Sequence, residues 1–392
     1  MLPLVEFPTI VRHYAPWFEE VFSAKAFVQF QRYLSGLIVS ENKTVDGINR
    51  IVVIESRNQS SLNRLLRESP FSEAALNLQR LALLDSLEGT RIKPKGVLSV
   101  DDTLLTHYGQ HFDEIAYLYD HVQKRYTWAH NLVSLHYSDD QTDYPLYFQL
   151  WRPANIEKLE QGLQAAGISL RQSKFALKDG NPQKWRQYLL GVWRRHQNKP
   201  EVAALYQSKL MIARNLLSKW AKEHPELKLP VTFDNWYTQP AFCRFLDQEL
   251  GLPYVGTLAD DAQVILKVGR LTLGEFAQRL KQEHLQAGGK PVFHKIGITY
   301  KGQKETYYSY CRTHHIHNFG KQRLVINFNR EDLSDSPSFY ISNRLYNLWV
   351  SHASVAIAGP LKYITKRARQ RGWTSIRFGT LGPYTGILVL WP

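Results

Sequence analysis

Apolar residues near the amino terminus recur at helical spacing. Phe27, Phe30, Leu34 and Leu37 lie three or four residues apart, so they fall on one side of a helix. Hydroxyl residues stand where each would cap a following apolar segment: Thr44, Ser60 and Ser72. The pattern predicts a helical module over residues 1–90. Several arginines between these segments suit either a DNA-contacting module or an ordinary helical bundle with basic solvent faces: Arg50, Arg64, Arg67 and Arg80.

From residue 96 onward the pattern changes to that of β-strands. Gly96–Val100 is a short apolar run typical of a buried strand, and it leads directly into Asp101. Tyr126–Tyr137 and Leu146–Leu150 are rich in aromatic and β-branched residues, and a polar turn at 138–143 separates them. We therefore expect a β-hairpin beside the first strand.

The following residues alternate between helical and strand patterns. A helix is expected near 202–223, a strand at Leu229–Phe233, a second helix at 238–249 and a strand at Tyr254–Leu258. A three-stranded meander followed by helix–strand–helix–strand is the order of a ribonuclease-H-like α/β fold. The first part of this catalytic domain is predicted to span residues 91–290.

The remaining segments predict an insertion and a tail. Thr272 and Glu275 have the spacing of a capping box that opens a helix. Residues 291–345 return to a β pattern and are predicted to be a β-rich insertion followed by the return to the catalytic fold. Residues 346–392 do not continue a fold pattern and are interpreted as an aberrant C-terminal tail.

Two short segments leave alternatives open. The Trp- and Arg-rich run at 184–195 suits either DNA contact or an amphipathic helix packed on the core. The His-rich run Thr313–His317 has a spacing that could place two imidazoles on one face of a strand, as in a metal site. Because no acid or cysteine cluster accompanies it, a surface or DNA-facing strand is the favoured interpretation.

The charge of the chain favours a polyanionic partner. Lys and Arg number 49 against 35 Asp and Glu, which gives a formal net charge of +14. Cations that bind phosphates release counterions, so this surplus favours nucleic acid over the alternatives of a solvated basic surface or a ribosome-associated protein. The two cysteines, Cys243 and Cys311, argue against a disulfide scaffold or a cysteine-ligated zinc site. No stretch approaches the ~20 apolar residues of a membrane span. We expect a cytoplasmic, nucleoid-associated protein with no membrane partner.

Acidic residues directly follow two of the predicted buried strands. Asp101, with Asp102 beside it, follows the first strand, and Asp234 follows the strand at Leu229–Phe233. In a ribonuclease-H-like sheet those strand ends are neighbours, and paired carboxylates repel each other unless a cation lies between them. The pattern predicts a two-metal phosphoryl-transfer site. The alternative is that these aspartates only form turns or cap helices.

Several segments of the chain, in order, resemble bacterial insertion-sequence transposases of the Asp-Asp-Glu (DDE) class. The similar segments run from the helical start, through the strands that carry the aspartates, to the β insertion: Phe30–Leu37, Asn58–Leu66, Ser99–Leu105, Tyr126–Val133, Thr232–Tyr237, Asn318–Val325 and Tyr340–Leu345. The resemblance implies DNA transposition by Mg²⁺- or Mn²⁺-dependent cleavage and joining at element ends. Double-stranded DNA is the implied partner, bound by a possible homodimer.

The resemblance also implies roles for individual residues. Asp101 matches the first metal ligand, with Asp102 as the alternative, and Asp234 matches the second. Trp236 and Tyr237 stand where an aromatic pair could pack below the site or meet a flipped base. Further candidates for DNA contact lie in the segment similar to the β insertion: Lys321 and Arg323.

The third metal-binding carboxylate of the family has no counterpart in this sequence. After a segment such as Ile341–Leu345 the family pattern requires a helix carrying a Tyr-x-x-Arg-Trp-x-Ile-Glu-like motif. Residues 336–392 contain neither Asp nor Glu, so no third acidic ligand is assigned. Gly359–Lys366 can be encoded by codons which, read two bases on, give Pro-Ile-Glu-Val-Tyr-Tyr-Lys. We hypothesise that the reading frame slips after Leu345; the alternative is a divergent terminus that uses Glu331 or Asp335.

These observations predict a transposase whose catalytic site is incomplete. A two-metal site that lacks one carboxylate would position neither ion well, so strand transfer should be severely reduced. One alternative is a catalytically inactive DNA-binding remnant that competes for element ends. Another is an unrelated ribonuclease-H-like nuclease.

Overall fold

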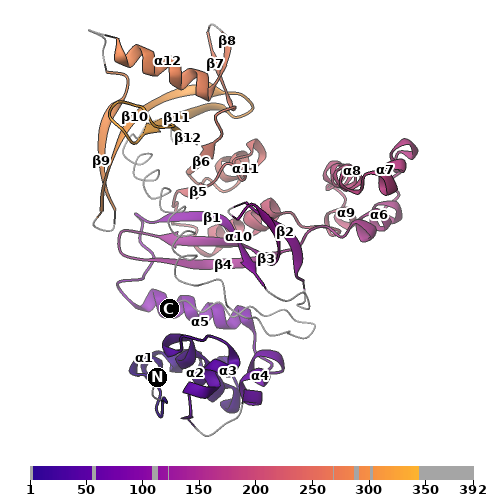
Figure 1. The fold of residues 1–392 in the computed structure, drawn as a ribbon, viewed down its shortest axis with the longest axis vertical. Coiled ribbons are helices and arrows are strands. Elements are labelled where there is room, and N and C mark those ends of the chain that lie inside the picture. Colours follow the sequence, from indigo (N-terminus) through magenta and orange to yellow (C-terminus); the bar gives the residue numbers. More distant parts are fainter. Residues whose placement is uncertain are drawn as a thin grey trace.

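The computed structural model describes most of the chain up to residue 343 (Figure 1). The described ranges are 3–54, 59–107, 114–121, 123–267, 269–286, 291–300 and 303–343. The predicted tail at 346–392, and with it the proposed frame slip, lies outside the described residues. No helix in the described ranges is long and apolar enough to cross a membrane.

The helices expected before residue 90 are present. They are α1 (Thr9–Tyr14), η1 (Ala15–Val21), α2 (Ala24–Val39), α3 (Val45–Ile51), α4 (Gln59–Arg67) and α5 (Glu73–Ser86). All of them except α1 contribute to one apolar core around Phe30, which is fully buried. Thr44 and Ser72 cap α3 and α5 as expected. The prediction for Ser60 was wrong, because α4 begins at Gln59 and Ser60 therefore lies inside its first turn.

Helix α5 connects the N-terminal helices to the sheet. The Arg80 guanidinium donates to the carbonyl of Pro145 at 2.6 Å, and the Asn77 amide donates to the carbonyl of Leu146 at 3.0 Å. Arg80, one of the arginines considered for DNA contact, thus has a structural role in joining α5 to a strand.

The central sheet has the strand order of a ribonuclease-H-like fold. Its first strands are β1 (Val97–Thr106), β2 (Ala116–Asp120), β3 (Arg125–Ser138) and β4 (Asp143–Trp151). β3 pairs antiparallel with β1, β2 and β4. β5 (Val231–Phe233) and β6 (Tyr254–Leu258) follow parallel to β1, in the order β1-β5-β6. The predicted α/β fold class is confirmed.

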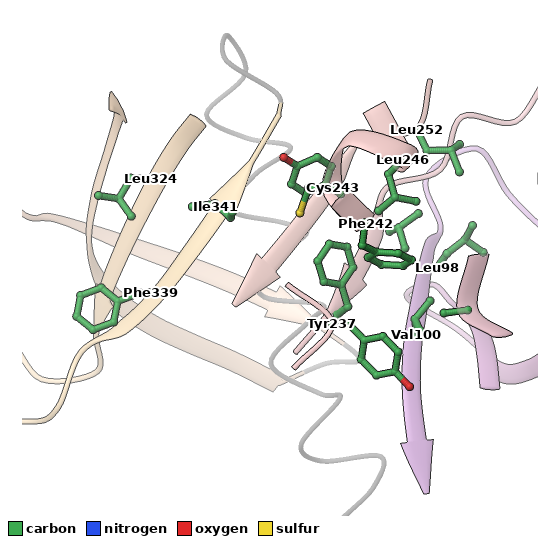
Figure 2. Packing of buried hydrophobic residues seen from close by; sticks show 14 of the residues in the cluster. Leu98, Val100, Tyr237, Phe242, Cys243, Leu246, Leu252, Leu324, Phe339 and Ile341 are labelled. Carbon is green, nitrogen blue, oxygen red and sulfur yellow. The ribbon is translucent and has the colours of Figure 1, made fainter. Parts of the chain in front are cut away.

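Helices cover the parallel strands and bury them. α10 (Lys209–Glu223) packs against β3 and β4, while α11 (Pro240–Arg244) and the π-helical turn η4 (Phe245–Glu249) follow β5. All three residues of β5 are buried: Val231 and Phe233 lie in the apolar core, and the Thr232 hydroxyl hydrogen-bonds that of Ser99 on β1 at 3.0 Å. Tyr237 and Phe242 pack beside Leu98 and Val100 of β1 (Figure 2).

The β-rich segment extends the same sheet. It comprises β7 (Gln263–Leu266), β8 (Gly269–Thr272), α12 (Leu273–Leu285), β9 (His294–Tyr300), β10 (Gln303–Ile316), β11 (Gly320–Phe328) and β12 (Ser338–Ser342). β12 returns to pair antiparallel with β6, and β7, which precedes residue 291, pairs with β10. The capping box predicted at Thr272 and Glu275 is present at the start of α12.

The chain between β4 and α10 forms a small helical lobe, which stands to the right of the sheet in Figure 1. It comprises α6 (Ile156–Ala165), η3 (Gln172–Lys174), α7 (Ala176–Gly180), α8 (Pro182–Arg195) and α9 (Pro200–Ala203), with an apolar core of its own. In α8 both Trp185 and Trp193 are buried in that core. Residues 184–195 thus form an amphipathic helix that packs within this lobe, and DNA contact by its exposed Arg194 and Arg195 stays a prediction.

Candidate active site

The candidate site lies where the parallel pairing of β1 and β5 ends. The last paired residues are Val100 and Phe233, so Asp101 and Asp234 are the next residues on the two strands. β5 ends at Phe233 as expected. The expectation that β1 also ends before Asp101 was wrong, because β1 continues to Thr106 through its pairing with β3. Asp101 and Asp102 thus lie within a continuing strand, whereas Asp234 lies in the turn after its strand.

Asp101 and Asp102 point to opposite faces of β1, because side chains alternate along a strand. The Asp102 carboxylate accepts hydrogen bonds from Asn131 at 2.8 Å, from Lys209 Nζ at 2.7 Å and from the Tyr237 hydroxyl at 3.4 Å. Asp101 Oδ1 instead accepts the backbone N–H of Asp102 at 2.8 Å. Asp102 is therefore the carboxylate that meets residues of the segment after β5.

Asp234 forms the turn that follows β5. Its Oδ1 accepts the backbone N–H groups of Trp236 at 3.0 Å and Tyr237 at 3.2 Å, and its carbonyl accepts the Thr238 hydroxyl at 2.7 Å. Asp234 therefore does form a turn, as the alternative interpretation of this residue expected. It does not exclude a metal, because these carboxylate hydrogen bonds all end on Oδ1.

The electrostatics of the site favour a cation. Burial raises the pKa of Asp234, and repulsion from the Asp102 carboxylate adds to this rise, against the opposing backbone N–H groups and Lys209. Burial likewise raises the pKa of Tyr237, and the negative charges of Asp102, Asp101 and Asp234 raise it further. Carboxylates that destabilise one another's charge are stabilised by a hard divalent cation, which prefers oxygen ligands.

Lys209 supplies a positive charge at this site. It is the first residue of α10, whose N-cap is Ser208. Its ammonium, besides bonding Asp102, lies 4.8 Å from the ring centroid of Trp151 and 5.5 Å from that of Trp236. Lys209 could not be found from the sequence, since 107 residues separate it from Asp102 and no motif marks it.

The adjacent aromatic residues have different environments. Tyr237 is fully buried, whereas the Trp236 side chain is 47% exposed beside Lys209. Their rings meet edge to face with centroids 4.8 Å apart. Tyr237 thus packs below the site, and Trp236 presents an open ring at its surface.

Lys321 and Arg323 lie elsewhere. Both are on β11, which β6 and β12 separate from β5 in the sheet. Lys321 is exposed, and Arg323 Nε lies 3.1 Å from the Cys311 sulfur. The structure does not bring either residue to the aspartates.

The two acids considered as replacements for the missing third ligand, Glu331 and Asp335, accept hydrogen bonds within the β-rich segment. Glu331 accepts the Tyr308 hydroxyl at 2.9 Å, and Asp335 accepts the backbone N–H groups of Asn329 and Arg330 within the β11–β12 connection. In the His-rich run, the His314 ring hydrogen-bonds the Tyr310 hydroxyl at 2.7 Å. Across the described ranges, no group of three or more His, Cys, Asp or Glu is arranged to hold a metal.

Comparison with known proteins places this site in a family. The family described as DDE superfamily endonuclease matches residues 17–273, which include Asp101, Asp102 and Asp234. Among solved structures, the chain is similar to a piggyBac transposase in a synaptic complex with hairpin DNA, with a TM-score of 0.38 and 12% identity. That alignment covers 92% of this chain and 66% of the other. No curated protein matches. The family match spans most of the chain, and the protein therefore belongs to the DDE superfamily of endonucleases.

Proposed function

We propose that this chain is a DNA transposase, or a derivative of one, built to cleave and join DNA at the ends of a mobile element. The observation that carries the proposal is the approach of Asp102 to the Asp234 turn where β1 and β5 part. Membership of the DDE superfamily supports it, because these endonucleases use divalent metal ions.

Asp102 and Asp234 would hold the metal, with Mg²⁺ or Mn²⁺ the expected ion. Asp102 is favoured over Asp101 as the first ligand, because Asp102 contacts Tyr237 and Lys209 while Asp101 faces the other side of β1. The donor set fits, since two carboxylates with mutually unfavourable charges suit a hard cation. Two bound metal ions would activate the attacking water or 3′-hydroxyl and stabilise the leaving oxygen.

Strand transfer by this chain is expected to be impaired. Residues 336–392 contain neither Asp nor Glu, and Glu331 and Asp335 bond within the β-rich segment. A reading frame that slips after Leu345 accounts for the missing acid. The second candidate function, favoured by the same absence, is a DNA-binding remnant that competes with an intact transposase for element ends.

The proposed partner is double-stranded DNA, bound by a homodimer at the nucleoid. The net charge of +14 supports a polyanionic partner. The exposed ring of Trp236, next to the Lys209 ammonium, would meet a flipped base beside the metal site. Lys321 and Arg323 would contact DNA away from the cleavage point.

The experiment uses duplexes that carry the DNA flanking the coding region. Gel-shift binding and Mg²⁺-dependent strand transfer are measured for this chain, for a chain with the shifted frame restored after Leu345, and for the restored chain carrying Asp234→Asn. We expect end-specific binding by all three and strand transfer by the restored chain alone. Absence of end-specific binding would contradict both candidate functions, and equal transfer by the first two proteins would contradict the impairment.

A further inference from the structure

The hairpin of β2 and β3 carries four aromatic residues on one face. In the register of the hairpin Tyr117 lies opposite Trp128, and Tyr119 lies opposite Tyr126. Residues two apart on a strand share a face, and so do residues directly opposite each other. These four side chains therefore form an aromatic grid, two on each strand.

The rings of the aromatic grid contact one another. The Tyr117 and Tyr126 rings are stacked, with centroids 5.4 Å apart and an interplanar angle of 22°. Tyr117 and Trp128 have centroids 5.3 Å apart, and Tyr119 and Tyr126 have centroids 5.1 Å apart. Cross-strand aromatic pairs stabilise a hairpin, and this accounts for the contacts within the grid.

The outward faces of the grid are open. The exposed fractions are 58% for Tyr117, 39% for Tyr119 and 54% for Tyr126. Large aromatic side chains gain most by burial, so three neighbouring exposed rings on one hairpin are not explained by hairpin stability alone. In contrast, Tyr137 and Tyr144, a cross-strand pair further along the same sheet, are buried.

The end of the hairpin that carries the open rings is basic. Lys124 is exposed in the turn with a positive φ of 52°, and Arg125 is exposed on the other face of β3, opposite Asp120 in the register. The one acid of β2, Asp120, is buried, and its carboxylate accepts the backbone N–H of Gln123 at 3.1 Å. Exposed rings on a basic hairpin are complementary to nucleobases joined by phosphates.

The same strand connects the grid to the candidate active site. Asn131, which donates to Asp102, follows Tyr126 by five residues on β3. This separation corresponds to about 17 Å along a strand. The rings and Asp102 lie on opposite faces of the strand, so the grid is a separate surface next to the site.

We propose that this aromatic grid binds unpaired nucleobases of DNA on the face of β3 opposite to Asp102, by stacking on its open rings. The inference rests on the proposed function, because it needs DNA at the site. The expected ligand is unpaired DNA, because bases stacked inside a duplex cannot offer their faces to the rings.

The test compares three forms of the full chain. They are the wild type and two double variants. Tyr117→Leu with Tyr126→Leu keeps apolar bulk but removes the ring faces. Tyr117→Phe with Tyr126→Phe keeps the rings and removes only the hydroxyls. Each is titrated at low salt with a fluorescent single-stranded oligodeoxynucleotide and with the duplex of the same sequence. Sedimentation of each form without DNA measures self-association.

The leucine variant should bind the single strand roughly tenfold or more weakly than the wild type, given the usual worth of base stacking. The phenylalanine variant and all duplex affinities should stay within about twofold of the wild type. Equal single-strand binding by all forms would overturn the grid proposal while leaving the proposed function intact. Loss of self-association in the leucine variant, with DNA binding unchanged, would also overturn it. Failure of the wild type to bind either DNA would count against the proposed function itself.

Discussion

Replacement of Lys209 by methionine tests whether its ammonium occupies the place of a cation at the site. The Lys209 Nζ to Asp102 Oδ2 distance is 2.7 Å, and the side chains are only 17% and 22% exposed. Fully exposed pairs contribute about 0–1 kcal/mol, and removal of one partner from a buried pair costs about 3–5 kcal/mol. For this partly buried pair we expect Lys209→Met to lower the free energy of unfolding by about 2 kcal/mol in the presence of a chelator.

The effect of metal should have the opposite sign. In the wild type a divalent ion must displace the Lys209 ammonium from Asp102 before it can bind there. Since loss of that contact is expected to cost about 2 kcal/mol, Lys209→Met should bind Mn²⁺ up to about thirtyfold more tightly. Mn²⁺ should therefore stabilise the variant more than it stabilises the wild type.

The assay is denaturant unfolding over a Mn²⁺ titration, with Trp fluorescence as the probe. Lys219→Met is the matched control, since Lys219 lies on the same helix and pairs with Glu223 at 3.9 Å, where both side chains are about half exposed. The control should change the stability by at most about 0.5 kcal/mol and leave the Mn²⁺ affinity unaltered. Equal or weaker Mn²⁺ binding by Lys209→Met, with a normal control, would refute the reasoning.

Three further substitutions test the scaffold. Burial acts to raise the pKa of Asp139, but backbone N–H groups and the Tyr137 hydroxyl outweigh it and lower that pKa. Its stabilisation is therefore present above about pH 4 and lost as pH falls through the lowered pKa, so Asp139→Asn should destabilise at pH 7 by about 2 kcal/mol and progressively less below pH 4 in acid-unfolding titrations. Thr272→Ala removes the cap of α12 and should cost about 1 kcal/mol in urea unfolding; no loss would contradict the capping box. Gly256→Ala would place a Cβ 2.6 Å from the Phe233 ring, so it should cost about 1–3 kcal/mol and weaken Mn²⁺ binding at the adjacent turn. If the Gly256→Ala variant is destabilised but its Mn²⁺ affinity is unchanged, the packing of Gly256 against Phe233 does not influence the metal site.

The strands that carry the aspartates could be predicted because each is a short apolar run followed by an acid. The choice between Asp101 and Asp102 could not be predicted, since it depends on β1 continuing to Thr106 and on which face of the strand meets Lys209. Lys209 itself has no sequence signal, because the fold alone brings it to Asp102 from a distant segment.

The helical lobe shows a different limit of sequence analysis. In α8 the buried positions Trp185, Leu189, Val192 and Trp193 do have helical spacing. Lys184 and three arginines stand beside these positions, however, so the segment is polar on average and indicated DNA contact as strongly as a packed helix. The lobe packs on itself, and that arrangement depends on contacts between α6, α8 and α9 that no local pattern specifies.

The central claim is that Asp102 and Asp234 together hold a divalent metal ion. The most direct measurement is Mn²⁺ binding, followed by isothermal titration calorimetry and electron paramagnetic resonance, to the full chain and to Asp101→Asn, Asp102→Asn and Asp234→Asn. The account predicts that Asp102→Asn and Asp234→Asn lose at least about tenfold in affinity, the equivalent of about 1.4 kcal/mol, while Asp101→Asn binds like the wild type. Loss of binding in Asp101→Asn with Asp102→Asn unaffected, or no difference among the variants, would contradict it.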